Sequence, residues 1–234
     1  MNNSKATVIQ NWIFDLDNTL YPAECNLFAQ IDERMGSFIA ELLDVDRTQA
    51  RKVQKDYYFR YGTTLNGLMR EHQLDPHIYL DYVHDIDHSV LPDLPELNSA
   101  LAALPGRKFI FTNGSAAHGE NVAAALGILD VFDSIFDIAA ADFTPKPNKP
   151  AYDQFLKHHN VLPQNSIMFE DLHPNLKVPH ELGMSTVLVH SNYEDHPAQR
   201  ERLNWENLPD YIHHETTNLV EFLDAENLKS AALL

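Results

Sequence analysis

The sequence predicts an α/β fold, and three observations support this. Short β-rich runs alternate with helical segments through the second half of the chain, which is typical of a Rossmann-like parallel sheet with right-handed crossovers. The block from residue 21 to residue 90 has a helical pattern throughout, so it predicts a helical insertion after the first strand. The 234 residues are enough for one core with such an insertion.

The expected elements follow from the residue pattern in chain order. Residues 7–14 (TVIQNWIF) are β-rich and end at an acidic turn, so they predict the first strand. Apolar residues then recur at helical spacing over 26–43, and Asp75-Pro76 is a typical helix start. The remaining helices are expected at 47–61, 64–72, 78–87, 94–104, 116–126, 151–159, 174–182 and 217–223, and the remaining strands at 108–112, 134–138, 166–169, 185–190 and near Tyr211. This order predicts a core of residues 1–20 and 91–234 and a helical domain of residues 21–90.

Composition limits the classes of function. The chain has 17 Lys and Arg against 34 Asp and Glu, a formal charge of -17, and no basic run, so neither a nucleic acid polymer nor an anionic membrane is expected as a partner. Its single cysteine, Cys25, cannot form an intramolecular disulfide, and we expect it to be a small apolar filler. No signal peptide or membrane span is expected, which favours a cytoplasmic location, and a homodimer remains possible.

Polar residues follow several predicted strands. Asp15 and Asp17 end the first strand, and Thr112 and Asn113 open the turn before a helix, where hydroxyl and backbone N–H groups can hold an anion. Lys146 lies in a Pro-rich turn, and Glu170-Asp171 end another strand. Because ligands bind beyond the carboxyl ends of parallel strands, we expect one phosphate-binding site.

The charges of these residues indicate a metal. Four carboxylates face one lysine, and two like charges ~4 Å apart repel by ~4 kcal/mol at an effective dielectric of ~20. Mg²⁺ fits, because it binds carboxylates, water and a substrate phosphate together. Asp15 can then attack phosphorus to form an aspartyl-phosphate. We expect repulsion by its neighbours to keep a proton on Asp17 for general acid/base work, and Thr112 and Lys146 to balance charge on the transferring oxygens.

The segments IFDLDNTL, FIFTNGS, PKPNKPAY and FEDLHPN, in this order, resemble the four motifs of the haloacid-dehalogenase superfamily of phosphohydrolases. The resemblance implies that Asp15 is the nucleophile, Asp17 the acid/base and a backbone-carbonyl metal ligand, and Asp171 a Mg²⁺ ligand, with Glu170 acting through water. It also makes Thr112 and Lys146 the phosphate holders. Lys146 is preferred to Lys149 because family members carry an aromatic six residues after the lysine, where Tyr152 stands. The helical insertion resembles a C1 cap, since Lys146 follows Thr112 by only 34 positions.

The segments FDLDNTLYP, YGTTLNGL and MFEDL with NLKVPHELGM resemble the pyrimidine 5′-nucleotidase branch. This resemblance implies Mg²⁺-dependent hydrolysis of a small phosphomonoester, a nucleoside monophosphate. A sugar phosphate or phosphoglycolate phosphatase, a phosphomutase or phosphotransferase, a haloacid dehalogenase and a silent phospho-ligand binding module stay open. The EF-hand and the two-component receiver do not fit, the first by its ligand positions and the second by its motif order.

Two further groups are expected to be structural. His84 and His88, four residues apart near Asp81 and Asp85, indicate a solvated helix face rather than a metal clamp. The aromatic residues of the segment 57–61 are expected to pack within the helical insertion rather than contact substrate.

Overall fold

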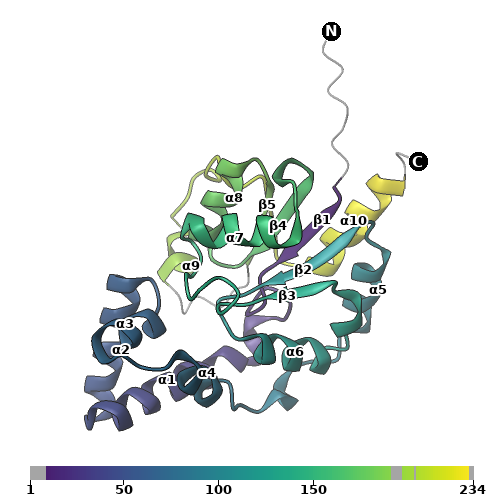
Figure 1. Ribbon diagram of the computed structural model, residues 1–234. Helices are drawn as coiled ribbons and strands as arrows, with labels where there is room; N and C mark the ends of the chain where they lie inside the picture. Colours follow the sequence, from purple (N-terminus) through teal and green to yellow (C-terminus); the bar gives the residue numbers. More distant parts are fainter. Residues whose placement is uncertain (1–8, 191–196, 203, 232–234) are drawn as a thin grey trace.

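The computed structural model describes residues 9–190, 197–202 and 204–231 (Figure 1). A parallel sheet of six strands has the order β3-β2-β1-β4-β5-β6. The strands are β1 (Asn11–Phe14), β2 (Arg107–Phe111), β3 (Ser134–Phe136), β4 (Ser166–Glu170), β5 (Ser185–Val189) and β6 (His214–Thr216). The predicted α/β fold with a helical insertion after the first strand is confirmed. Central β1 pairs with β2 on one side and β4 on the other, so Phe14 lies opposite Ile110 and Phe169.

The two faces of the sheet bury alternate residues of each strand. On β1, Trp12 and Phe14 join one apolar cluster and Ile13 joins the other, as expected when successive side chains point to opposite faces. The first cluster also includes side chains of α5 (Pro95–Ala103), α6 (Ala116–Ala125) and α10 (Leu219–Ala231). The second includes side chains of α7 (Lys149–His159) and α8 (Lys177–Leu182). Helices therefore cover both faces of the sheet (Figure 1), and α9 (Pro197–Arg202) follows β5.

Four helices between β1 and α5 form the insertion, which lies beside the sheet (Figure 1). They are α1 (Leu27–Leu43), α2 (Arg47–Tyr61), α3 (Thr64–His72) and α4 (Pro76–Val83). Capping side chains fix three of the starts, because Asp46, Thr63 and Asp75 each accept a bond from a helix N–H. The inserted helices share an apolar cluster that also contains Ile138 from the loop after β3, so they pack against the core.

Several element bounds differ from the sequence prediction. The strand expected near Tyr211 is β6, which begins at His214, because the Tyr211 carbonyl and His213 Nδ1 instead bond Thr186. The helix expected over 78–87 ends at Val83, and a short 3-10 turn (His88–Val90) follows it. Residues 7 and 8 of the first predicted strand lie outside the described residues.

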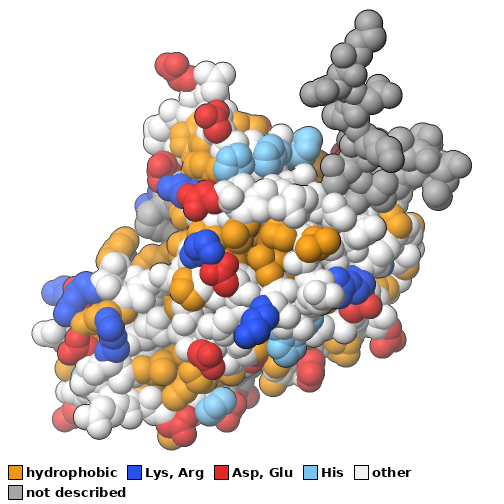
Figure 2. Space-filling view, turned by 45° about the horizontal axis from the view of Figure 1, so that its top comes forward, with side chains coloured by type: hydrophobic (Ala, Val, Ile, Leu, Met, Phe, Trp, Pro, Cys, Tyr) orange, Lys and Arg blue, Asp and Glu red, His pale blue; other side chains and the backbone are white. Residues whose placement is uncertain are grey.

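On the face drawn in Figure 2, Lys and Arg side chains lie among Asp and Glu side chains and between apolar ones. Within the described part of the chain, no helix is both long and apolar enough to span a membrane.

Candidate active site

Three adjacent strands end at the same place. Asp15 follows β1, Thr112 follows β2, and Glu170 is the last residue of β4, with Asp171 directly after it. The N–H of Asp15 donates to the Phe169 carbonyl at 2.9 Å, so the sheet pairing continues to the nucleophile candidate and fixes its main chain. Asp15 and Asp171 are each 8% exposed and Glu170 is 1% exposed.

Lys146 joins these strand ends from the loop after β3. Its ammonium is buried and donates three hydrogen bonds of 2.7 Å, to Asp15 Oδ1, Glu170 Oε1 and the Phe111 carbonyl. Asn113 holds the Lys146 main chain, because its Oδ1 accepts from the Lys146 N–H and its Nδ2 donates to the carbonyl. The side-chain amide of Asn113 is therefore engaged in placing the lysine. Lys149 instead lies on the surface, paired with Asp153.

The carboxylates outnumber the cation. Oxygens of Asp15, Glu170 and Asp171 lie within 4.8 Å of one another, which is close enough for one metal ion. Burial, then the charge of Glu170, raises the pKa of Asp15 to about 7 despite the opposing effect of Lys146. Burial and the charges of Glu170 and Asp15 likewise raise the pKa of Asp171 well above its usual range. This excess of buried negative charge fits a cation held by oxygen ligands.

Protein groups hold both carboxylate oxygens of Glu170, which together accept three hydrogen bonds. Oε1 accepts from Lys146 and from Asn175 Nδ2 at 2.7 Å, and Oε2 accepts from the Leu172 N–H. Tyr152 in turn donates to the Asn175 carbonyl, so the aromatic residue that follows Lys146 supports the same cluster.

Asp17 lies in a different environment from Asp15. His118 Nε2 lies 2.9 Å from Asp17 Oδ1, and the Tyr21 hydroxyl donates to the same oxygen at 2.6 Å. Burial acts to raise the pKa of Asp17, but the charge and hydrogen bonds of His118 and Tyr21 outweigh it and lower the pKa below the usual value. The expectation that repulsion keeps a proton on Asp17 is therefore wrong for the protein without substrate.

The turn after β2 is built around small groups. Thr112 is buried, and its Oγ1 accepts from the Gly114 N–H at 2.9 Å. Ser115 caps α6 by accepting from the His118 N–H. A Cβ on Gly114 would lie 3.2 Å from the His118 ring and 3.3 Å from Thr112 Oγ1, so a side chain there would crowd both. The main chain of this turn can thus approach a ligand closely.

His118 was not identified from the sequence, and His84 lies in a different environment from the one predicted. The ring of His84 is stacked on that of His118, with centroids 4.3 Å apart, and its Nδ1 bonds Ser115 Oγ. Burial, followed by the charge of His118, lowers the pKa of His84 to about 3. The predicted solvated face is wrong for His84, because α4 ends at Val83 and the His84 ring instead packs on His118 and Ser115. One signal for His118 was available: it falls on the same helix stripe as Val122 and Ala123, where a polar residue is unexpected.

The aromatic segment of α2 has mixed roles. Tyr57 is buried within the insertion, as predicted, whereas Phe59 is 71% exposed. Burial raises the pKa of Tyr58, and the charges of Asp171 and Glu170 raise it further. Tyr58, which is 37% exposed, is therefore within electrostatic reach of the acidic cluster, and its exclusion from substrate contact stays a prediction.

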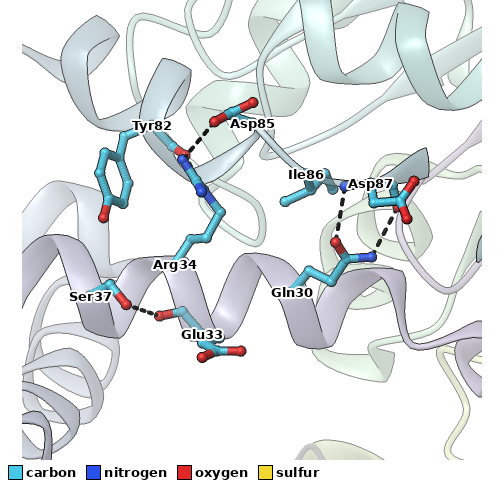
Figure 3. A pocket seen from close by; sticks show the side chains of 8 residues that line it. All are labelled: Gln30, Glu33, Arg34, Ser37, Tyr82, Asp85, Ile86 and Asp87. Carbon is cyan, nitrogen blue, oxygen red and sulfur yellow. Dashed lines mark hydrogen bonds and ion pairs between the residues drawn. The ribbon is translucent and has the colours of Figure 1, made fainter. Parts of the chain in front are cut away.

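A groove of about 560 Å³ lies elsewhere on the insertion, between α1 and the end of α4 (Figure 3). Its polar groups already bond across it. Arg34 donates to the Tyr82 carbonyl and pairs with Asp85, and Gln30 exchanges two hydrogen bonds with the Asp87 main chain (Figure 3). None of these residues belongs to the acidic cluster, so we interpret the groove as a joint between helices.

The fold and the buried carboxylates at the ends of β1 and β4 define an α/β protein with a cluster of acidic oxygen ligands at the strand ends. The family description "haloacid dehalogenase-like hydrolase" matches residues 9–183, and the chain belongs to this family. It is 27% identical over 197 residues to Phosphate metabolism protein 8 of Saccharomyces cerevisiae, a match that covers 76% of this chain and 60% of that protein's length.

Solved structures support the fold. A HAD phosphatase from Thermococcus onnurineus is similar, with a TM-score of 0.61 at 16% identity over 93% of this chain and 98% of that one. An L-2-haloacid dehalogenase from Xanthobacter autotrophicus has a TM-score of 0.60 at 17% identity over 94% and 98% of the two chains. At such identities the likeness concerns the fold alone.

Proposed function

We propose that this protein is a Mg²⁺-dependent phosphatase that hydrolyses nucleoside 5′-monophosphates, with pyrimidines preferred, through an aspartyl-phosphate on Asp15. One observation carries the proposal: the buried oxygens of Asp15, Glu170 and Asp171 lie within 4.8 Å of one another, and Lys146 pairs with Asp15 and Glu170. Such a site attracts a divalent cation, and a cation beside a carboxylate nucleophile suits a phosphate substrate. Membership of a hydrolase family supports the same reaction class.

The donor set fits Mg²⁺, which prefers oxygen ligands and retains several waters. In our proposal the carboxylates of Asp15 and Asp171 and the main-chain carbonyl of Asp17 would hold the ion. In the same proposal Glu170, whose oxygens accept three hydrogen bonds within the protein, would act through water. When bound, the ion neutralises the carboxylates and the incoming phosphate and so makes their approach favourable.

In the first step an Asp15 carboxylate oxygen attacks phosphorus, and the bond from phosphorus to the ester oxygen breaks. Asp17 gives its proton to the leaving oxygen. Lys146, Thr112 and the backbone N–H groups of Asn113 and Gly114 balance charge on the transferring oxygens. Asp17 acquires that proton as substrate binds, because a dianionic phosphate nearby raises the pKa of a carboxyl group.

In the second step a water oxygen attacks phosphorus of the aspartyl-phosphate. Asp17 takes the proton of this water, the bond from phosphorus to Asp15 breaks, and phosphate leaves. The same carboxyl thus serves first as acid and then as base. The cycle restores both aspartates without any further reactant.

We propose that residues 21–90 act as a cap over the site. A Cβ on Gly62 would lie 3.7 Å from Pro145, next to Lys146, so the end of α2 lies close to the Lys146 turn. The charges of Asp171 and Glu170 act on Tyr58 of the same helix, so its side chain lies within electrostatic reach of the site. We therefore expect Tyr58→Ala to change the ranking of substrates by KM, while Phe59→Ala, at an exposed neighbour, leaves it unchanged. Equal rankings in both variants would remove Tyr58 from the substrate contact.

The test is phosphate release from pyrimidine and purine monophosphates, sugar phosphates and phosphoglycolate, with Mg²⁺ or EDTA, for the wild type and Asp15→Asn. We expect UMP or CMP to be hydrolysed fastest, and both EDTA and the substitution to abolish turnover. If sugar phosphates or phosphoglycolate lead, the nucleotide assignment fails and the general phosphatase stands. Phosphoryl transfer to an added nucleoside or sugar would indicate a phosphotransferase. Full activity of Asp15→Asn would refute the mechanism.

A further inference from the structure

Two hydrogen-bond donors hold one oxygen of Asp17. His118 Nε2 and the Tyr21 hydroxyl both bond Oδ1, at 2.9 and 2.6 Å. Within the described residues, Oδ2 accepts no hydrogen bond. Because both donors hold the same oxygen, they fix the plane of the carboxyl group and leave Oδ2 as the oxygen that can exchange a proton with substrate.

His118 is itself held on several sides. Its side chain is fully buried, and its ring lies 4.3 Å from the parallel ring of His84. Its backbone N–H donates to Ser115 Oγ, which also bonds His84. Its Nδ1 has no partner in the described part of the chain. Because an ionised carboxylate can only accept a hydrogen bond, the Nε2 that faces Asp17 Oδ1 carries a proton and donates it.

We propose that His118 is a positioning residue that aims Oδ2 of Asp17 at the leaving-group oxygen and, later, at the attacking water. This inference rests on the proposed phosphatase function, because it assigns a role in that same reaction. Helix α6 carries His118, so the turn that places Thr112 also places the group that orients the acid. A buried histidine with one ring nitrogen on a carboxylate and the other unpaired is otherwise a costly choice on an apolar helix stripe.

The role predicts a dependence on the leaving group. A nucleoside leaves as an alkoxide and needs a proton from Asp17, whereas 4-nitrophenolate is stable without one. If Oδ2 of Asp17 is no longer oriented towards the leaving oxygen, aspartyl-phosphate formation therefore slows with UMP but not with 4-nitrophenyl phosphate. Breakdown of the aspartyl-phosphate needs Asp17 as base with either substrate, so it slows for both.

A matched pair of variants tests this. His118→Gln places an amide N–H near the position of Nε2, and His118→Asn is one methylene shorter and cannot reach Asp17. We expect kcat/KM of His118→Asn for UMP to fall about 10- to 100-fold, as is common for residues that orient a catalytic group, with little change for 4-nitrophenyl phosphate. We also expect a burst of 4-nitrophenolate in its first turnover, and partial recovery of UMP hydrolysis in His118→Gln. Thermal melts check that both variants fold.

The outcomes separate this inference from the proposed function. If the wild type hydrolyses no phosphate ester, the function itself fails before any variant is compared. If it hydrolyses other alkyl phosphates but not UMP, glycerol 3-phosphate replaces UMP in the comparison. Equal losses of kcat/KM on both substrates without a burst, or full UMP activity in His118→Asn, would overturn the role of His118 while leaving the function intact.

Discussion

Replacing Lys146 by Met removes the cation of the acidic cluster while keeping a side chain of similar length. The ammonium lies 2.7 Å from an oxygen of Asp15 and from one of Glu170. Each attraction amounts to roughly 6 kcal/mol at an effective dielectric of ~20, and the cost of burying the ammonium offsets much of it. Removal of one member of a buried ion pair typically costs ~3–5 kcal/mol. For a chain of this size, that loss lowers Tm by roughly 6–20 °C.

The assay is thermal unfolding at pH 7.5 in EDTA and in excess Mg²⁺. We expect the Tm deficit of Lys146→Met to be largest in EDTA and smaller in Mg²⁺, because a bound cation neutralises the same carboxylates. Lys149→Met is the matched control, since Lys149 lies 55% exposed beside Asp153 and surface pairs contribute little. If Lys146→Met melts with the wild type in EDTA, or if Lys149→Met loses as much, the charge argument for the site is wrong.

Two further predictions concern pH and the backbone. Burial and the charge of Glu170 raise the pKa of Asp15 to about 7, so the folded protein in EDTA keeps a proton that the unfolded chain releases near pH ~4. The stabilisation from this proton on Asp15 is therefore present below pH ~4 and lost as pH rises to about 7. We expect Asp15→Asn to lack this loss, and urea unfolding of both proteins across that pH range measures the difference. Gly106→Ala should cost more than Gly127→Ala in urea unfolding. Both have positive φ (83° and 68°), at a cost of ~1–2 kcal/mol for Ala, but a Cβ at Gly106 would also lie 2.3 Å from the Gln10 carbonyl while Gly127 has open space. Parallel pH profiles for wild type and Asp15→Asn, or equal costs at the two glycines, would contradict these arguments.

The fold could be predicted because its signals are local and repeated. Apolar runs such as 108–112 and 166–169 and the helical spacing over 26–43 each specify an element without reference to distant residues. The predicted ends of strands and helices differ from the structure where contacts with distant residues determine them. Residues 137 and 138 were expected to extend β3, but Asp137 caps the turns at Ala116 and Ala140, and Ile138 bonds the Gly114 carbonyl and packs against the insertion.

The site could be predicted only in part, for a similar reason. The residues placed at strand ends follow from strand order, so Asp15, Glu170 and Asp171 were expected to meet, and they do. Contacts between an insertion and the core have no sequence period, and the residues that use them, Tyr58 and His84, were not identified. A sequence pattern also does not predict the direction of a pKa shift, since the direction depends on burial and on which charged and hydrogen-bonding groups the fold brings near.

The two aspartates at the exit of β1 show why that last point matters for mechanism. They are two residues apart, yet the pKa of Asp15 is raised, first by burial and then by Glu170, whereas His118 and Tyr21 lower the pKa of Asp17. Carboxyl groups with opposite shifts are suited to different roles. In the proposed mechanism, a bound cation would favour the ionised, nucleophilic form of Asp15, and a bound phosphate would favour the proton that makes Asp17 an acid. The proposed mechanism therefore needs both the cation and the substrate before the two aspartates can take their separate roles.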